Sequence, residues 1–142
     1  MKPFELIEHT ADIGIKAHGA TLTELFENSA KGMFSVMVGE GYKAQGSRAK
    51  KNIKLEANTD NLEEMLVNWL SELLHIFNRE KIYFSDFKIS GLNNNRMEAE
   101  ASGVDIDLYQ SDLYKEIKAV TFHNLKIEED VDGFSCTIIF DV

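Results

Sequence analysis

The sequence ends in DGFSCTIIFDV, residues 132–142, and this segment decides the fold class. Apolar residues at every second position place one face of an extended strand against a core, and they are Phe134, Cys136, Ile138, Phe140 and Val142. The opposite face carries Ser135, Thr137, Ile139 and Asp141. The preceding Asp132–Gly133 pair is typical of a hairpin turn. The segment therefore predicts a half-buried strand after a tight turn, with Asp141 directed away from the core.

Two amphipathic helices are predicted upstream of this strand. The first begins at a capping box formed by Thr21 and Glu24 and ends at Gly39. The second begins at Asp60, with Glu63 three residues further on, and repeats apolar residues every three or four positions. Its apolar stripe consists of Leu62, Met65, Leu66, Trp69, Leu70, Leu73 and Phe77. A stripe with this spacing is typical of a helix face packed into a core.

Further strands follow from apolar residues that alternate with polar ones. Strand candidates cover residues 4–7, 13–17, 53–57, 82–90, 97–101 and 104–108, and residues 117–127 form one long strand or two short ones. Together with the helices they predict an α+β fold, in which two amphipathic helices pack on a mixed, largely antiparallel sheet. No linker-like composition interrupts the chain, so a single domain over residues 1–142 is expected.

The charge balance argues against nucleic acid as a direct partner. The chain has 24 acidic and 15 basic residues, which gives a net charge of −9. Strong nucleic-acid binding depends on cations that face phosphates, so it is not expected here, whereas a basic protein surface would suit this charge. The basic residues between positions 43 and 54 have no interleaved aromatic residues and are interpreted as a solvated loop and strand edge.

Location can also be inferred from the composition. No apolar run approaches the roughly 20 residues that a membrane helix needs, and residues 1–9 contain no signal-peptide core, so membrane insertion and secretion are not expected. The single cysteine, Cys136, falls in an apolar run and is expected to be a core side chain rather than a nucleophile. A reducing, cytoplasmic location fits this cysteine usage.

Acidic groups near the two ends of the chain suggest a cation site. Asp12 interrupts a strand-like stretch, and Asp141 stands one residue before the terminal carboxylate of Val142. If the two ends of the fold meet, these three groups would offer the oxygen ligands that a hard divalent cation prefers. Spacing alone leaves this open against the alternative of ordinary solvated acids.

Other candidate residues can each be interpreted either as functional or as ordinary surface residues. Asp105 and Asp107 share one strand face and would bind a cation or lie on a solvated sheet. Lys118 would be a partner-facing cation or a charge that protects an edge strand from aggregation. The histidines show no helical pairing that predicts a zinc site, and no phosphate-cradling glycine loop or nucleophile elbow is present.

Three motifs in this order resemble the archease family: HTADIGI at residues 9–15, KAVTFH at 118–123 and FDV at 140–142. The resemblance covers essentially the whole chain, including Gly32–Phe34 and the helix with Trp69–Leu70. It implies a non-enzymatic helper of tRNA maturation, which activates the GTP-dependent tRNA-splicing RNA ligase by promoting its guanylylation and multiple turnover. It also implies, as an alternative, a chaperone-like modulator of a tRNA cytosine-5 methyltransferase.

The same resemblance assigns roles to four residues. It implies a divalent metal site, with calcium as the associated ion, formed by Asp12, Asp141 and Val142. Lys118, together with Asp12, is implied in activation of the partner. The family often has tyrosine where Phe122 stands, which removes a hydroxyl here but not the site. These roles lead to the expectation that an acidic tip docks near the ligase active site.

Overall fold

The structure, a computed structural model, describes residues 2–8, 12–39, 51–105 and 114–142. Along these segments the elements follow in the order β1 (Phe4–Glu8), β2 (Asp12–Gly19), α1 (Leu22–Val38), β3 (Lys51–Asn58), α2 (Leu62–Glu80), β4 (Ile82–Leu92), β5 (Arg96–Asp105), β6 (Ala119–Val120), β7 (Glu128–Asp130) and β8 (Gly133–Asp141).

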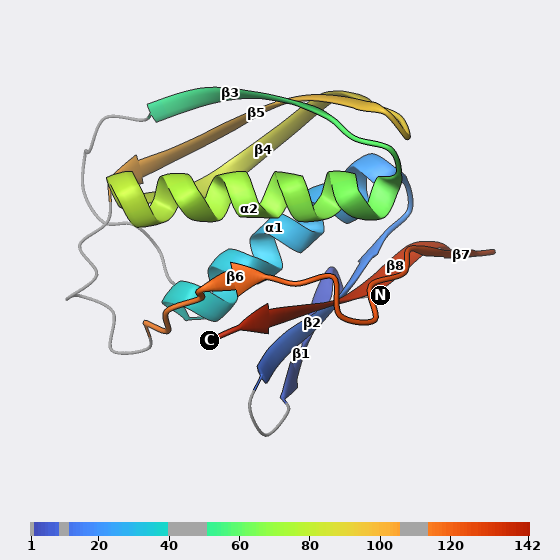
Figure 1. The fold of residues 1–142 in the computed structure, drawn as a ribbon, viewed down its shortest axis with the longest axis horizontal. Helices are drawn as coiled ribbons and strands as arrows, with labels where there is room; N and C mark the ends of the chain where they lie inside the picture. Colours follow the sequence, from blue (N-terminus) through green and yellow to red (C-terminus); the bar gives the residue numbers. More distant parts are fainter. Residues whose placement is uncertain (1, 9–11, 40–50, 106–113) are drawn as a thin grey trace.

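The strands form two antiparallel sheets, and the two helices lie between them (Figure 1). One sheet has five strands in the order β1-β2-β8-β6, with β7 also paired to β8; the other has the order β3-β5-β4. The predicted α+β class, with two helices packed on largely antiparallel strands, is confirmed. The strands form two sheets rather than the one predicted. Alternation identifies the buried face of a strand but not its neighbours, so it could not predict this division.

Both helices begin with a side-chain cap. In α1 the hydroxyl of Thr21 accepts a hydrogen bond from the Glu24 amide at 3.1 Å, as the sequence predicts. Helix α2 begins one residue later than predicted, because Asn61 rather than Asp60 is the cap and accepts from the Glu64 amide at 2.9 Å. Both positions carry a capping residue followed by glutamate three residues later, so the sequence pattern does not distinguish them.

The core lies between the helices and the sheets. Trp69 on α2 is buried, and its indole Nε1 donates a hydrogen bond to the Phe26 carbonyl of α1 at 3.0 Å. Phe34 on α1 packs edge-on against Phe77 and Phe84, with ring centroids 5.7 and 5.9 Å apart. The predicted apolar stripe of α2 is therefore a core face, with only Leu62 half-buried.

Two strand predictions were wrong in their extent. The predicted strands 97–101 and 104–108 belong to the single strand β5, which continues to Asp105 because Gly103 pairs with both neighbouring strands. Residues 106–108 lie outside the described segments. Within 117–127 only β6 is a strand, because the chain turns after it, with the Leu125 amide bonded to the Phe122 carbonyl at 3.0 Å. The hairpin before β8 is confirmed, with Asp130 paired to Gly133.

No helix within the described segments is long and apolar enough to cross a membrane. The basic stretch 43–54 is described only from residue 51, where Lys51 and Lys54 are exposed on β3.

Candidate metal and partner site

Strand pairing brings the two ends of the sequence together. β2 and β8 are antiparallel neighbours, and Asp12 is the direct partner of Asp141 at the last position of their register. Residues directly opposite each other on antiparallel strands point to the same face, with Cβ atoms about 5 Å apart. The two acidic side chains therefore share one face at one end of the β2–β8 pair. Figure 1 shows these two strands side by side.

The adjacent pair of residues fixes the direction of these carboxylates. Ile13 and Phe140 are partners in the register, and both are buried in the core. Because side chains alternate along a strand, Asp12 and Asp141 lie on the face that points away from this core. Asp141 is exposed and Asp12 is half-buried, so both carboxylates are within reach of solvent or of a partner.

Val142 follows directly on Asp141 at the end of β8. Its side chain is half-buried and packs against the hydrophobic core. The residue that follows β8 is thus anchored, and its backbone oxygens lie next to the acidic pair.

Lys118 is joined to the same point by its backbone. The Lys118 amide donates a hydrogen bond to the Asp141 carbonyl at 2.7 Å, and the next residue, Ala119, is the register partner of Asp141. The Lys118 side chain is exposed. The fold therefore brings together the backbones of the four residues to which the family resemblance assigns roles: Asp12, Lys118, Asp141 and Val142.

The donor set at this point suits a hard cation but does not complete its coordination. Two side-chain carboxylates and nearby backbone oxygens are ligands that calcium prefers, whereas calcium takes six to eight oxygens. Within the described segments no group of three or more His, Cys, Asp or Glu side chains is arranged to hold a metal ion. The remaining ligands would have to come from water, from the terminal carboxylate or from a partner.

The other candidate acids do not join this site. Asp105 is at the end of β5 in the three-stranded sheet, and its carboxylate is 3.1 Å from the Lys51 ammonium. Asp107 and His9 lie outside the described residues. His75 and His123 are exposed, and the His18 carbonyl accepts a bond from the Asn28 amide group at 2.7 Å. Asp105 therefore lies on the exposed end of the other sheet, paired with Lys51, and is not part of the site.

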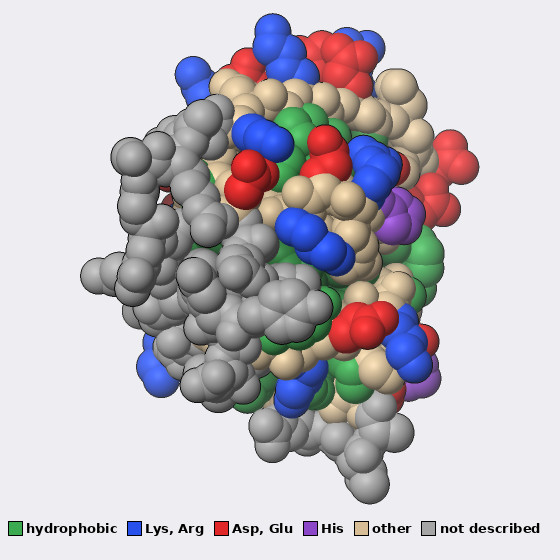
Figure 2. Space-filling view, turned by 90° about the vertical axis from the view of Figure 1, so that its left-hand side faces the viewer, with side chains coloured by type: hydrophobic (Ala, Val, Ile, Leu, Met, Phe, Trp, Pro, Cys, Tyr) green, Lys and Arg blue, Asp and Glu red, His purple; other side chains and the backbone are tan. Residues whose placement is uncertain are grey.

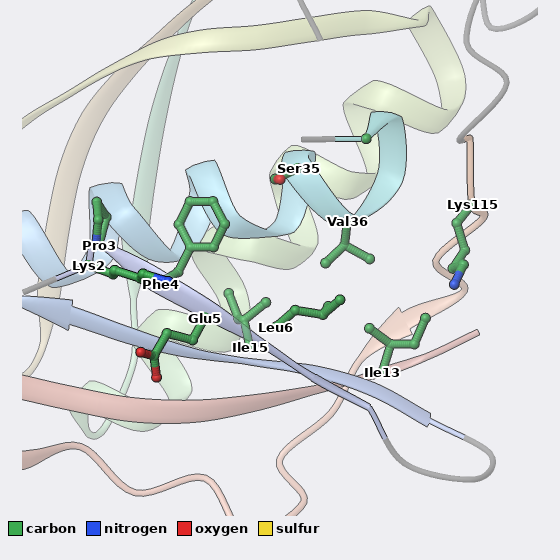
Figure 3. Close-up of a pocket in the computed structure, with 11 residues that line it drawn as sticks. Lys2, Pro3, Phe4, Glu5, Leu6, Ile13, Ile15, Ser35, Val36 and Lys115 are labelled. Atoms are coloured by element: carbon green, nitrogen blue, oxygen red, sulfur yellow. The ribbon is translucent and has the colours of Figure 1, made fainter. Parts of the chain in front are cut away.

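A second feature is an apolar groove between the β1–β2 hairpin and the C-terminal half of α1. It has a volume of about 910 Å³ and is lined by apolar side chains that include Phe4, Leu6, Ile13 and Val36 (Figure 3). Lys2 and Lys115 lie toward its two ends. The described lining contains no nucleophile paired with a base, so the groove offers an apolar contact surface rather than a reaction centre.

Surface charges are mixed on the face shown in Figure 2. Outside the grey atoms, acidic and basic side chains alternate over this face without a continuous basic patch. A nucleic-acid surface concentrates cations on one face. The described part of this face shows no such concentration of cations.

Cys136 is confirmed as a core residue. Its side chain is buried on β8, and burial raises the pKa of the thiol to about 12, a rise that the nearby Ser29 hydroxyl partly offsets. A thiol must lose its proton to act as a nucleophile, so this cysteine is unreactive near neutral pH.

At about pH 8, folded protein is expected to leave Cys136 unmodified by a chromogenic disulfide reagent, and unfolded protein is expected to react fully. Because the folded pKa is raised from 9.0, the thiol's contribution to stability is complete below pH 9 and is lost as the pH rises toward 12. The urea midpoint should therefore fall more steeply above pH 9 in the unchanged protein than in Cys136→Ala. Rapid labelling of the folded protein would contradict this assignment.

Comparison with known proteins identifies the family. The archease protein family model matches residues 4–142. The archease of Methanosarcina barkeri is 36% identical over 145 residues, which cover 99% of this chain and 97% of that protein. The chain belongs to the archease family. The archease of Thermococcus kodakarensis is also similar, with 35% identity and coverage of 94% and 93%.

Solved structures give the same result for the fold. The solution structure of Methanobacterium thermoautotrophicum protein 1598 matches with a TM-score of 0.75 and 30% identity, and the match covers 100% of both chains. The crystal structure of an archease from Thermotoga maritima, described as a possible chaperone, matches with a TM-score of 0.65 and 23% identity over 96% of this chain and 94% of that one. This chain thus shares its overall fold with both structures.

One structural feature of this site was not predicted from the sequence. Thr121 ties the segment after β6 to β8, because its hydroxyl donates to the Ile139 carbonyl at 2.9 Å and accepts from the His123 amide at 3.2 Å. A threonine two residues before a histidine carries no sequence signal for this bridge. It becomes visible only once β6 and β8 are known to be neighbours.

Proposed function

We propose that this archease is a non-catalytic partner protein of tRNA splicing, which activates the GTP-dependent tRNA-splicing RNA ligase by promoting its guanylylation and multiple turnover. The observation that carries the proposal is the direct pairing of Asp12 with Asp141, beside the backbone bond between Lys118 and Asp141. Membership of the archease family supports the general role of a helper protein.

The acidic pair has a defined task in this proposal. Asp12, Asp141 and the terminal carboxylate of Val142 would hold a divalent ion, with calcium as the expected metal, on the exposed side of the sheet. A bound divalent ion supplies positive charge that offsets negative charge on phosphate oxygens. The carboxylates orient this charge toward the partner, because they lie on the face that points away from the core.

Lys118 complements the acids. Its backbone is fixed by the bond to the Asp141 carbonyl and its side chain is exposed, so its ammonium is available to a partner that docks at this end of the sheet. An exposed ammonium at this position would contact a phosphate or a carboxylate of the partner.

The test is ligase guanylylation in the presence of Asp12→Asn or Asp141→Asn. Each variant keeps the side-chain shape and removes one of the two carboxylates that would bind the metal ion. Stimulation of ligase guanylylation is therefore expected to fall by about tenfold or more. Calcium binding to the complex, measured by titration calorimetry, is expected to weaken in parallel. Glu128→Gln is the matched control, because it removes an exposed carboxylate from β7 in the same sheet and should change neither measurement.

Lys118→Met extends the experiment to the cation. Methionine keeps the backbone amide that bonds to Asp141, so a loss of stimulation would be due to the ammonium alone. Full stimulation by Asp12→Asn and Asp141→Asn, both folded, would reject the proposed site.

The apolar groove favours a second candidate, a chaperone-like modulator of a tRNA cytosine-5 methyltransferase. Such a role needs accessible apolar surface, and the groove beside β1 with its exposed Leu6 provides one. It does not need the acidic pair. Protection of a methyltransferase from aggregation that survives Asp12→Asn and Asp141→Asn would favour this role, and co-purification with the ligase alone would count against it.

A further inference from the structure

The turn after β6 holds a large aromatic side chain in solvent. Val120 on β6 is buried opposite Phe140, and strict alternation would place Phe122 on the same buried face. Instead β6 ends after Val120, and the side chain of Phe122 is 56% exposed. The chain then returns to the core at Leu125. Phe122 thus departs from the alternation of buried and exposed residues that β6 begins. Such departures from a local sequence pattern are expected at functional sites.

Hydrogen bonds fix the backbone on both sides of Phe122. The Thr121 amide and hydroxyl both donate to the Ile139 carbonyl, at 3.1 and 2.9 Å, and the Leu125 amide donates to the Phe122 carbonyl at 3.0 Å. Asn124 adopts a left-handed conformation with φ of 55°, which short polar side chains tolerate. Because the backbone is already ordered, a partner that contacts this ring loses little additional entropy.

The turn is close to the acidic pair. Thr121 is bonded to Ile139, which stands two residues before Asp141, a distance of about 7 Å along an extended strand. The same short segment also carries Lys118 at its beginning. The exposed ring, the cation and the acids thus belong to one end of the sheet.

Phe122 differs in position from the other exposed apolar residues. Isolated exposed apolar side chains are common and need no explanation. Leu6 is 57% exposed but lies on the edge strand β1, which β2 separates from β8. Val131 is fully exposed at the β7–β8 turn, the opposite end of β8 from Asp141. Among the large exposed apolar residues of the described segments, Phe122 alone lies on the short segment that begins at Lys118 and bonds to β8 two residues before Asp141.

We propose that Phe122 is the apolar anchor through which the acidic site docks on its protein partner, and that it enters an apolar pocket rimmed by basic side chains. The inference rests on the function proposed above and adds the contact that holds the partner in place. Aromatic side chains dominate the binding energy of protein interfaces when they fill a pocket at the centre, with charged groups around them. A basic rim on the partner would complement the carboxylates of Asp12 and Asp141 and the net charge of −9 of this chain.

Equilibrium binding of the full-length protein to the tRNA-splicing RNA ligase tests the inference. Phe122→Ala is expected to raise the dissociation constant by about 30-fold, the change typical of an aromatic anchor. Phe122→Tyr keeps the ring and should bind within about threefold of the unchanged protein. Val131→Ala removes an exposed apolar side chain at the opposite end of β8 from Asp141 and is the control, with no change expected. At saturating concentration Phe122→Ala should still stimulate guanylylation, because Asp12, Lys118 and Asp141 are retained.

A direct readout of the ring complements the affinities. Trp69 is already buried, so in Phe122→Trp the added indole is the one whose emission should shift to shorter wavelength when the ligase is added. Unchanged affinity of Phe122→Ala, or the absence of this shift in a complex that forms, would overturn the inference while the proposed function stands. A ligase that neither binds nor responds to the unchanged protein would overturn both.

Discussion

Replacing Trp69 by alanine is expected to lower the free energy of unfolding by about 3–5 kcal/mol, the usual cost of removing a buried large aromatic side chain. Trp69 is 1% exposed and packs edge-on against Phe87, with ring centroids 5.9 Å apart. Its indole also joins α2 to α1 through the bond to the Phe26 carbonyl. Truncation would thus open a cavity and remove a link between the helices. Urea denaturation followed by far-UV circular dichroism measures the loss.

Two companion variants separate these contributions. Trp69→Phe keeps most of the apolar volume but removes the indole donor, and we expect a smaller loss of about 1–2 kcal/mol. Glu72→Ala changes an exposed residue on the same helix and should stay within about 0.5 kcal/mol of the unchanged protein. A loss below about 1 kcal/mol for Trp69→Ala would show that this side chain is not central to the core.

The parts of the fold that depend on local rules could be predicted from the sequence. The cap at Thr21, the apolar stripe of α2 and the alternation in β8 each follow from neighbouring residues, and the structure has all three. The direction of Asp141, away from the face that buries Phe140, also followed from alternation. These features need no knowledge of distant segments, since helix and strand periodicity determine the buried face.

The non-local features could not be derived in the same way. Nothing near Asp12 in the sequence indicates that it pairs with Asp141, because strand partners are chosen by the packing of the whole sheet. The resemblance to the archease family supplied that expectation instead. Likewise, the residues after Val120 alternate well enough for a strand, but the chain turns there, with the Leu125 amide bonded to the Phe122 carbonyl. The division into two sheets had no local signal.

The register of β2 and β8 links the core to the candidate site. A slip of one residue between these strands would move Asp141 to the opposite face from Asp12. At the other end of this strand pair, Gly19 pairs with Phe134, and Gly133 follows the β7–β8 turn. The backbones approach so closely there that a Cβ added at Gly133 would collide with the Gly19 carbonyl oxygen and lie 2.9 Å from the Ala20 Cα. This contact helps to fix the register.

Gly133→Ala is therefore expected to destabilise the protein by about 2–4 kcal/mol, through the collision with the β2 backbone and the strain of a side chain at φ of 132°. Gly91→Ala is the control, because a Cβ at Gly91 meets nothing within 4 Å, and its effect should stay within about 0.5 kcal/mol. Urea denaturation of both variants gives the difference. Under conditions where Gly133→Ala remains mostly folded, hydrogen exchange should accelerate along β2 and β8 more than in the three-stranded sheet, because the disturbed contact belongs to this pair. Equal stability of the two variants would mean that this close approach does not hold the strands in register.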